Sequence, residues 1–375
     1  MLTVLMGRAK TGKSETVLRR MAELGDSSRQ ILLVPEHASH QAEIDLCRAC
    51  GPTASRHAEV LSFRRLSDRV LSITGGIAQV TLDAGGRLLT MQKALGEVAS
   101  QLTVYRRPSQ KAAFLQQLLD LFDELRSYEV TPRILYEQAQ DIRGATHDKL
   151  LDLSLLYGAY ESRLARPGFD QRDRMSKLAD HLEESEYVLG KDVFLDGFTY
   201  FNGQERRVLS VLLRQARAVT ITLLGEPDSR EEIFEASLKT LGQLRRLCEE
   251  ERCPMEVQTL RREGTGALAH VERYFFGENR PYDGQDLPIR VLAADNVFSE
   301  VEQAAAEIRR LTAAGKCRYR DITVAARNMA EYAGTIETVF ERYGIPVYLS
   351  RRSDILEKPA LALLTGVLAA IGNGY

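Results

Sequence analysis

The stretch MLTVLMGRAKTGKS, residues 1–14, decides how the chain is interpreted. Thr3–Met6 is a short apolar run, which is typical of a buried strand in a parallel sheet. Gly7–Ser14 follows it and fits the pattern G-x-x-x-x-G-K-[ST], and Glu15–Leu24 is predicted to be a helix. The motif therefore stands between a strand and a helix, which is the context that a phosphate-binding loop requires.

Each part of this loop has a chemical task in holding a nucleotide phosphate. Glycines let backbone N–H groups face phosphate oxygens, and the helix N-terminus adds partial positive charge. Lys13 would reach the β- and γ-phosphates, and the Ser14 hydroxyl would ligate magnesium. We therefore expect ATP and Mg²⁺ as cofactors; the alternative is a glycine turn that caps a helix. The predicted nucleotide-binding residues are Gly7, Arg8, Ala9, Lys10, Thr11, Gly12, Lys13 and Ser14.

The composition is that of an ordinary globular protein of two or three domains. The 375 residues are 44% hydrophobic and 27% charged, and 50 basic and 52 acidic side chains give a formal charge of −2. This balance does not by itself indicate nucleic-acid binding, so a basic groove would have to come from local clustering. No apolar run reaches the roughly 18 residues of a membrane span, and the N-terminus lacks a signal peptide. With five cysteines and no disulfide framework, we expect a cytoplasmic location and no membrane partner.

Further strands are predicted outward from the loop. Apolar runs at 31–34 and 59–63 resemble buried parallel strands, and the pattern returns at 193–195 and 219–224. Between them, apolar residues recur at helical spacing, which predicts an all-helical insertion. The predicted domains are a first lobe in two parts at 1–78 and 191–280, the insertion at 79–190, and the truncated start of a second lobe at 281–375.

The last third of the chain predicts a second α/β unit. Strands are expected at 289–293, 322–326 and 346–349, with helices at 300–314 and 332–343. Residues 277–286 are rich in Gly, Asn, Pro and Asp, and they are the predicted linker.

Asp196 is the candidate for a second magnesium contact. It follows the apolar run at 193–195, where a nucleotide hydrolase carries a metal-binding Asp that is usually followed by a Glu. Here Gly197 follows instead, so the expected base is missing, and ATP binding is favoured over fast turnover. Glu205 is an alternative base, and a strand-end turn is the alternative role of Asp196.

Taken in order, the motifs give a specific resemblance. They are MLTVLMGRAKTGKS at 1–14, LLVPEHASHQAE at 32–43, VLSFRRL at 60–66, VFLDGFTYFNGQE at 193–205, and SEVEQAAAEIRRL with YRDITVAAR within 299–327. The chain resembles the N-terminal part of the AddB family, which supplies one of the two subunits of the bacterial ATP-dependent helicase/deoxyribonuclease AddAB. The resemblance implies an α/β fold with a P-loop, RecA-like parallel sheet lobe, an all-helical insertion and the start of a second RecA-like lobe.

The resemblance also implies a function. The family lacks an active motor of its own, pairs with an AddA-like motor subunit, and resects double-strand breaks for homologous recombination until a Chi sequence is held. It implies an enzyme complex of the hydrolase class that acts on single-stranded and double-stranded DNA ends. The family's nuclease and 4Fe-4S cluster would lie beyond residue 375, so this piece is expected to have no catalytic residue. Lys10, where the family usually has Gly, and His37, Ser39 and His40 depart from the family pattern.

Two segments are predicted to contact single-stranded DNA in this fold. Polar side chains after residue 34 offer hydrogen bonds to bases, an aromatic ring near residue 61 offers stacking, and neighbouring arginines offer phosphate pairing. The alternatives are that Phe63 is a core residue, that the arginines lie on a solvated helix, and that the cluster at 200–202 serves lobe packing. The predicted DNA-binding residues are His37, Ser39, His40, Gln41, Phe63, Arg64, Arg65, Tyr200, Phe201 and Asn202.

Three further alternatives follow from the sequence. His37, His40, Cys47 and Cys50 have zinc-like spacing, but a helix over 40–50 would place His40 and Cys47 roughly 10 Å apart along its axis, which disfavours one shared ion. As a function, the rivals are an active DNA-dependent ATPase and a nucleotide-gated interaction module that never binds DNA. Turnover stimulated by DNA would favour the first, and failure to bind oligonucleotides at any salt concentration would favour the second.

Overall fold

The chain divides into two compact units, Met1–Asp286 and Leu287–Tyr375, which are described separately. The boundary falls at the end of the predicted linker. The structure is a computed structural model, and it describes residues 1–75, 82–106, 112–164, 174–261, 264–278, 280–285, 288–349 and 359–372.

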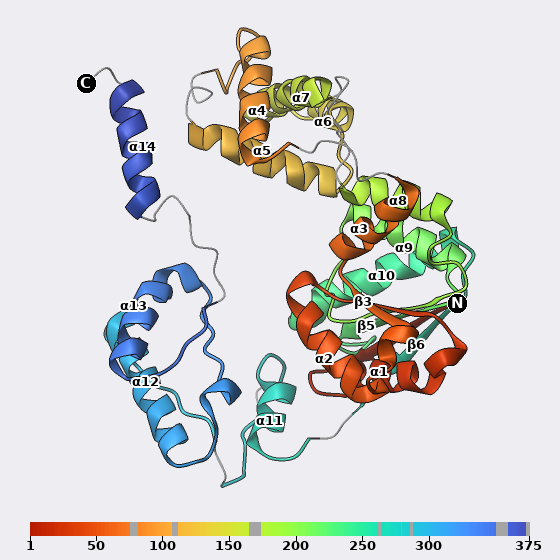
Figure 1. Cartoon of the computed structure of the whole chain (residues 1–375), viewed down its shortest axis with the longest axis vertical. Helices are drawn as coiled ribbons and strands as arrows, with labels where there is room; N and C mark the ends of the chain where they lie inside the picture. Colours follow the sequence, from red (N-terminus) through yellow and green to blue (C-terminus); the bar gives the residue numbers. More distant parts are fainter. Residues whose placement is uncertain are drawn as a thin grey trace. The chain divides into compact units, whose positions relative to one another are not determined.

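A six-stranded sheet organises the first unit (Figure 1). Neighbouring strands all run parallel, in the order β3-β2-β4-β5-β1-β6. Strand β1, next to the edge strand β6, has Leu2 opposite Val219 of β5 on one side and opposite Met255 of β6 on the other. The strands are β1 Leu2–Gly7, β2 Gln30–Leu33, β3 Ala58–Leu61, β4 Asp192–Leu195, β5 Ala218–Leu224 and β6 Met255–Thr259.

The strands predicted in this unit are confirmed, with two differences. The expected strand at 59–63 is shorter, because the Ser62 side chain accepts a hydrogen bond from the Arg65 amide and so caps a helix that begins at Phe63. Strand β6 is absent from the sequence predictions. It is a partly exposed edge strand that contains Glu256 and Gln258, so it lacks the continuous apolar run that marks a buried strand.

Helices cover both faces of the sheet, as expected for a RecA-like lobe (Figure 1). On β1, Leu5 points into the core with α1 and α2, while Val4 and Met6 point into the core on the opposite face. One face carries α1 Lys13–Leu24 and α2 Ser39–Cys50; the other carries α3 Phe63–Thr74, α8 Arg174–Ser185, α9 Gly203–Gln215 and α10 Glu235–Glu250.

The long crossover from β3 to β4 contains the predicted helical insertion, which has a core of its own. Phe122 is fully buried there and stacks on Tyr157, with ring centroids 4.6 Å apart. Helix α8 falls within the predicted bounds of the insertion, but it buries Leu178 and Leu182 in the core of the sheet. The apolar residues of α8 recur at the same helical spacing as those of the preceding helices. The spacing alone therefore does not show which core α8 joins. The insertion helices are α4 Ala84–Val98, α5 Ala112–Ser127, α6 Pro132–Gln140 and α7 Ala145–Leu164.

In the second unit the predicted helices form and the predicted strands do not. The described residues of 288–349 contain α12 Val297–Ala313 and α13 Met329–Arg342, and α14 Pro359–Gly372 follows. The segments 289–293, 322–326 and 346–349 contain no strand; Val291 is 94% exposed. The prediction of strands there is wrong because residue preference favours an extended backbone, whereas a strand also needs a paired neighbour.

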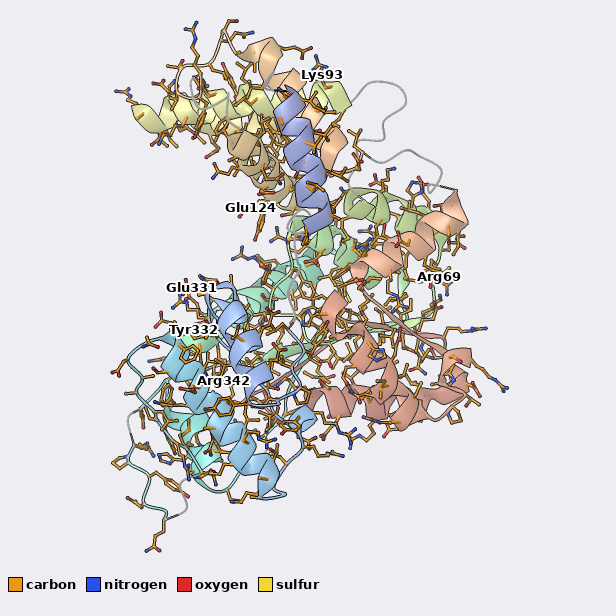
Figure 2. The ribbon with its side chains drawn as sticks, turned by 60° about the vertical axis from the view of Figure 1, so that its left-hand side comes forward. Arg69, Lys93, Glu124, Glu331, Tyr332 and Arg342 are labelled. Carbon is orange, nitrogen blue, oxygen red and sulfur yellow. The ribbon has the colours of Figure 1, made fainter. Side chains whose placement is uncertain are left out.

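Contacts between α12 and α13 hold the second unit together. Figure 2 labels Glu331, Tyr332 and Arg342 along α13. The Tyr332 hydroxyl donates to a Glu300 oxygen at 2.9 Å, and Arg342 lies over the ring of Phe298. Ile336 and Phe340 of α13 are buried against Val301 and Ile308 of α12. These helices therefore have a small core without a sheet.

Candidate nucleotide and nucleic-acid site

The carboxyl edge of the sheet gathers the motifs that the sequence analysis selects. Because neighbouring strands are parallel, the segments that follow them leave from the same edge. The phosphate loop follows β1, residues 34–41 follow β2, Ser62–Arg65 follows β3, and residues 196–202 follow β4. The connections from β1 and β5 lead to opposite sides of the sheet, so a topological switch point lies beside the loop.

The loop has the backbone shape that a phosphate cradle needs. Gly12 precedes α1 with a φ of 85°, in the left-handed region that favours glycine. A Cβ at Gly7 would lie 2.2 Å from the Thr11 hydroxyl oxygen and 2.8 Å from the carbonyl oxygen of Leu260. Both glycines are therefore required by geometry, and the sequence motif corresponds to a formed loop at a helix N-terminus.

Lys13 points back into the loop. Its Nζ donates to the carbonyl oxygens of Gly7 at 2.7 Å and Arg8 at 2.8 Å. Burial lowers the pKa of Lys13, while the charges of Asp196 and Glu272 act in the opposite direction. The ammonium group is thus partly desolvated at the mouth of the loop, where it would interact strongly with a bound anion.

Lys10 adopts a conformation that a non-glycine residue rarely takes. Its φ is 58°, in the left-handed region, and its side chain is exposed. The resemblance implies Gly at this position, and the Lys found there has the backbone conformation that favours glycine, so the loop carries backbone strain.

Arg8 is held by acidic side chains that the sequence analysis does not identify. Its guanidinium donates to Glu231 at 2.6 Å and 3.2 Å, and to Glu272 at 2.9 Å. It also donates to the carbonyl oxygen of Glu272 at 2.8 Å and lies over the ring of Phe234. Both glutamates are more than 220 positions away along the chain, so no local spacing indicates the contact.

Asp196 lies at the end of β4, two strands from β1, and its orientation is fixed. Thr222 on the intervening strand β5 donates its hydroxyl to Asp196 Oδ1 at 2.6 Å. Two strand spacings correspond to about 10 Å. The fold therefore presents the Asp196 carboxylate at the same edge as Lys13 and Ser14, whose hydroxyl is exposed at the start of α1.

The two positions considered for a catalytic base do not supply one. Gly197 has a φ of 83°, so a glutamate there would be strained by the backbone itself. Glu205 forms a capping box with Asn202: the Asn202 amide donates to Glu205 at 2.9 Å, and the Glu205 amide donates to Asn202. Burial raises the pKa of Glu205. Both side chains of this pair therefore serve the start of α9.

Several of the predicted DNA-binding residues are exposed on this edge. His37, His40, Gln41 and Arg64 are open to solvent, and Tyr200 is 62% exposed. Arg64 makes no ion pair with the residues that the structure describes. Exposed polar and aromatic side chains beside a phosphate-binding loop suit contact with a nucleic acid.

The remaining predicted DNA-binding residues have structural contacts. Phe63 and Phe201 are 6% and 3% exposed in the sheet core, and Phe198 lies between them with ring centroids 5.4 Å and 5.3 Å away. Phe63 is thus a core residue, which agrees with the alternative interpretation, because the first turn of α3 faces the sheet. Ser39 is also buried, and Arg65 pairs with Glu43 at 2.7 Å.

A cavity of about 1420 Å³ borders the loop on the side of β6. Arg8–Thr11, Leu260, Glu231 and Glu272 line it, whereas Lys13, Ser14 and Asp196 do not. The cavity therefore lies beside the positions predicted for the phosphates and magnesium. No sequence motif indicates this cavity, because its walls come from segments that carry no motif.

Three properties of the described part of the chain bear on other classes of site. Within it, no three His, Cys, Asp or Glu side chains come together as a metal site would require. Its five cysteines are free thiols. Nor does any described helix combine the length and apolar character that crossing a bilayer demands.

Comparison with known proteins shows which family the chain belongs to. The family model described as ADDB, N-terminal matches residues 4–272. The B-type subunit of the ATP-dependent helicase/deoxyribonuclease of Thermoanaerobacter sp. (strain X514) is 32% identical over 97% of this chain and 33% of its own length. The proteins of the same name from Pelotomaculum thermopropionicum and Clostridioides difficile are 34% and 28% identical over 99% and 100% of this chain, and 34% of their own lengths. The chain thus spans about a third of these relatives, and it belongs to the ADDB N-terminal family.

Proposed function

We propose that this chain binds ATP with Mg²⁺ and single-stranded DNA, as the front part of an AddB-type subunit of a helicase/deoxyribonuclease. The observation that carries the proposal is the phosphate loop, with left-handed Gly12 at the start of α1 and Lys13 turned into the loop. Loop amides and Lys13 would hold the phosphates. Ser14 and Asp196 offer the oxygen ligands that Mg²⁺ prefers.

We further propose that the site binds ATP without turning it over quickly. Hydrolysis needs a group that takes a proton from the attacking water. Gly197 offers no side chain, and the Glu205 carboxylate is part of the α9 cap. A bound nucleotide would then act as a structural and regulatory ligand of the lobe.

The DNA strand would follow the exposed carboxyl edge, over His37, His40, Arg64 and Tyr200. Arg64 offers a guanidinium for phosphates, and Tyr200 offers a stacking face. Phe63, Phe201 and Asn202 would support this edge from below instead of touching the bases, since the rings are core residues and Asn202 caps α9.

The role in the whole complex follows from the names of the relatives. They are named as one subunit of an ATP-dependent helicase/deoxyribonuclease, so a second subunit is implied, and we propose an AddA-like motor as the partner. DNA-end resection with Chi recognition would belong to that assembly. Nuclease and iron–sulfur chemistry would reside in the two thirds of the relatives that this chain does not span.

Exchanging Lys13 for alanine tests the nucleotide site. We expect Lys13→Ala to weaken ATP–Mg²⁺ binding by about 100-fold or more, because a partly buried ammonium is lost from the phosphates. Lys93→Ala, at an exposed lysine of the insertion helix α4, is the matched control and should change affinity little. Calorimetric titration measures both, and equal affinities for wild type and Lys13→Ala would refute the phosphate-loop assignment.

Exchanging the exposed edge residues tests the DNA path. We expect Arg64→Ala and Tyr200→Ala each to weaken oligonucleotide binding by about five- to 100-fold, with ATP affinity unchanged. Arg69→Ala is the control, since Arg69 lies on the same helix and pairs with Glu59 (Figure 2). Fluorescence anisotropy over a salt series measures this, and wild-type affinity in both edge variants would remove the edge from the DNA path. DNA-stimulated ATP turnover that Lys13→Ala abolishes would establish the active-motor alternative instead.

A further inference from the structure

Arg8 joins the phosphate loop to a helix that no motif marks. The helix is α11, Ala267–Tyr274, and it contributes the Glu272 side chain and the Glu272 carbonyl oxygen to the Arg8 guanidinium. The Arg8 side chain is only 12% exposed in this position. A guanidinium with so little exposed surface is held in place by its hydrogen-bond acceptors.

Apolar packing holds α11 only weakly. Ala267 is its single buried residue among those that the structure describes, and Leu268 is 62% exposed. The two hydrogen bonds to Arg8 are therefore a large part of what seats α11 against the loop. Helix α11 is also the last helix before the second compact unit, so its seating fixes where the connecting segment leaves the first unit.

The carboxylate of Glu272 acts on the phosphate-binding cation as well. Its charge raises the pKa of Lys13, which shows that it lies within electrostatic reach of the ammonium group. A nucleotide triphosphate at the loop would bring several negative charges towards Glu272. It would attract Arg8, which now donates to Glu272, and Lys13, on which the Glu272 charge acts.

We propose that nucleotide binding and the seating of α11 form one linked equilibrium, in which the triphosphate and Glu272 compete for Arg8 and Lys13. A bound triphosphate then releases α11 and frees the segment that leads to the second unit, and a seated α11 weakens nucleotide binding by the same factor. The inference rests on the proposed nucleotide site and adds its regulation.

Two isosteric exchanges test the competition. Glu272→Gln removes the charge near Lys13 but keeps an oxygen for Arg8, so ATP–Mg²⁺ affinity should rise by about threefold to tenfold. Glu278→Gln is the matched control: it also removes a carboxylate near the end of α11, but Glu278 pairs with Arg280 instead of Arg8, so affinity should stay within about twofold. Unchanged affinity in Glu272→Gln, or an equal gain in both variants, would overturn the competition.

Hydrogen exchange followed by mass spectrometry separates this inference from the proposed function. With ATP–Mg²⁺, amides of residues 8–15 should exchange more slowly, and amides of α11 should exchange about tenfold faster; Lys13→Ala should show neither change. Protection of the loop without faster exchange in α11 would overturn the linkage and leave the nucleotide site standing. No protection at the loop would refute the nucleotide site, and the linkage with it.

Discussion

The backbone angle φ at Gly197 limits which side chain this position can carry. In a hydrolase of this fold the position after the strand-end Asp carries the base, and the sequence shows only that the side chain is missing. The structure adds that φ is 83° at this position, with the amide donating to Thr222 at 3.3 Å. The same threonine orients Asp196, so the local conformation and the Asp196 carboxylate depend on one hydrogen-bonded unit.

Restoring the missing carboxylate should therefore fail to restore turnover. We expect Gly197→Glu to lose about 1–2 kcal/mol of stability through left-handed strain and to gain no ATPase activity. Gly197→Ala is the control, and it should show a similar loss because the strain arises at Cβ. Chemical denaturation and a phosphate-release assay measure the two effects; a stable, hydrolysing Gly197→Glu protein would show that the backbone imposes no such limit.

At the scale of elements, the sheet was predictable because each buried strand is a continuous apolar run next to a turn signal. In the second unit the helices were predictable and the strands were not, because the segments at 289–293 and 322–326 have the same local preference without a paired neighbour. The candidate site also has one part that the sequence predicts and one part that it does not. A contiguous motif determines the phosphate loop, whereas Arg8–Glu231, Arg8–Glu272 and Asp196–Thr222 join distant segments and leave no local pattern.

The cap of α9 should make stability depend on pH in a defined direction. Burial raises the pKa of Glu205, so its protonated form favours the fold, and this contribution is lost as the pH rises through the folded-state pKa. Glu205→Gln keeps an acceptor for the Asn202 amide and stays neutral. We expect the variant to be more stable than wild type at pH 7, with the difference vanishing below about pH 4.3, the ordinary pKa of Glu.

Denaturation at pH 4 and pH 7 measures this difference. Glu235→Gln is a control of opposite sign, because a hydrogen bond from Lys239 lowers the pKa of Glu235. That variant should lose a little stability at pH 7 and none at low pH. A Glu205→Gln protein that is less stable than wild type at pH 7 would contradict the burial argument.

At the scale of the whole molecule, the chain has separate cores. The sheet core, the insertion core around Phe122 and the small α12–α13 core share no residue. Separate cores permit separate unfolding transitions. The proposed nucleotide site rests on the sheet core, since the loop, Lys13 and Asp196 all follow its strands or begin its helices.

Removing the Phe122 ring should therefore unfold the insertion and spare the nucleotide site. We expect Phe122→Ala to cost about 3–5 kcal/mol in the insertion core and to lower one calorimetric transition, with ATP affinity unchanged. Phe194→Ala, in the sheet core, is the matched control and should weaken ATP binding as well. An equal loss of ATP affinity in both variants would show that the insertion supports the lobe.

The place of β1 in the sheet has a consequence for protein synthesis. β1 pairs only with β5 and β6, so residues 8–217 must be made before its first native neighbour exists. At about 5–20 residues per second, this apolar N-terminal segment waits roughly 10–40 s on the ribosome. During that interval a chaperone that covers short apolar strands would bind this segment, and the loop that follows β1 would not yet have its folded surroundings.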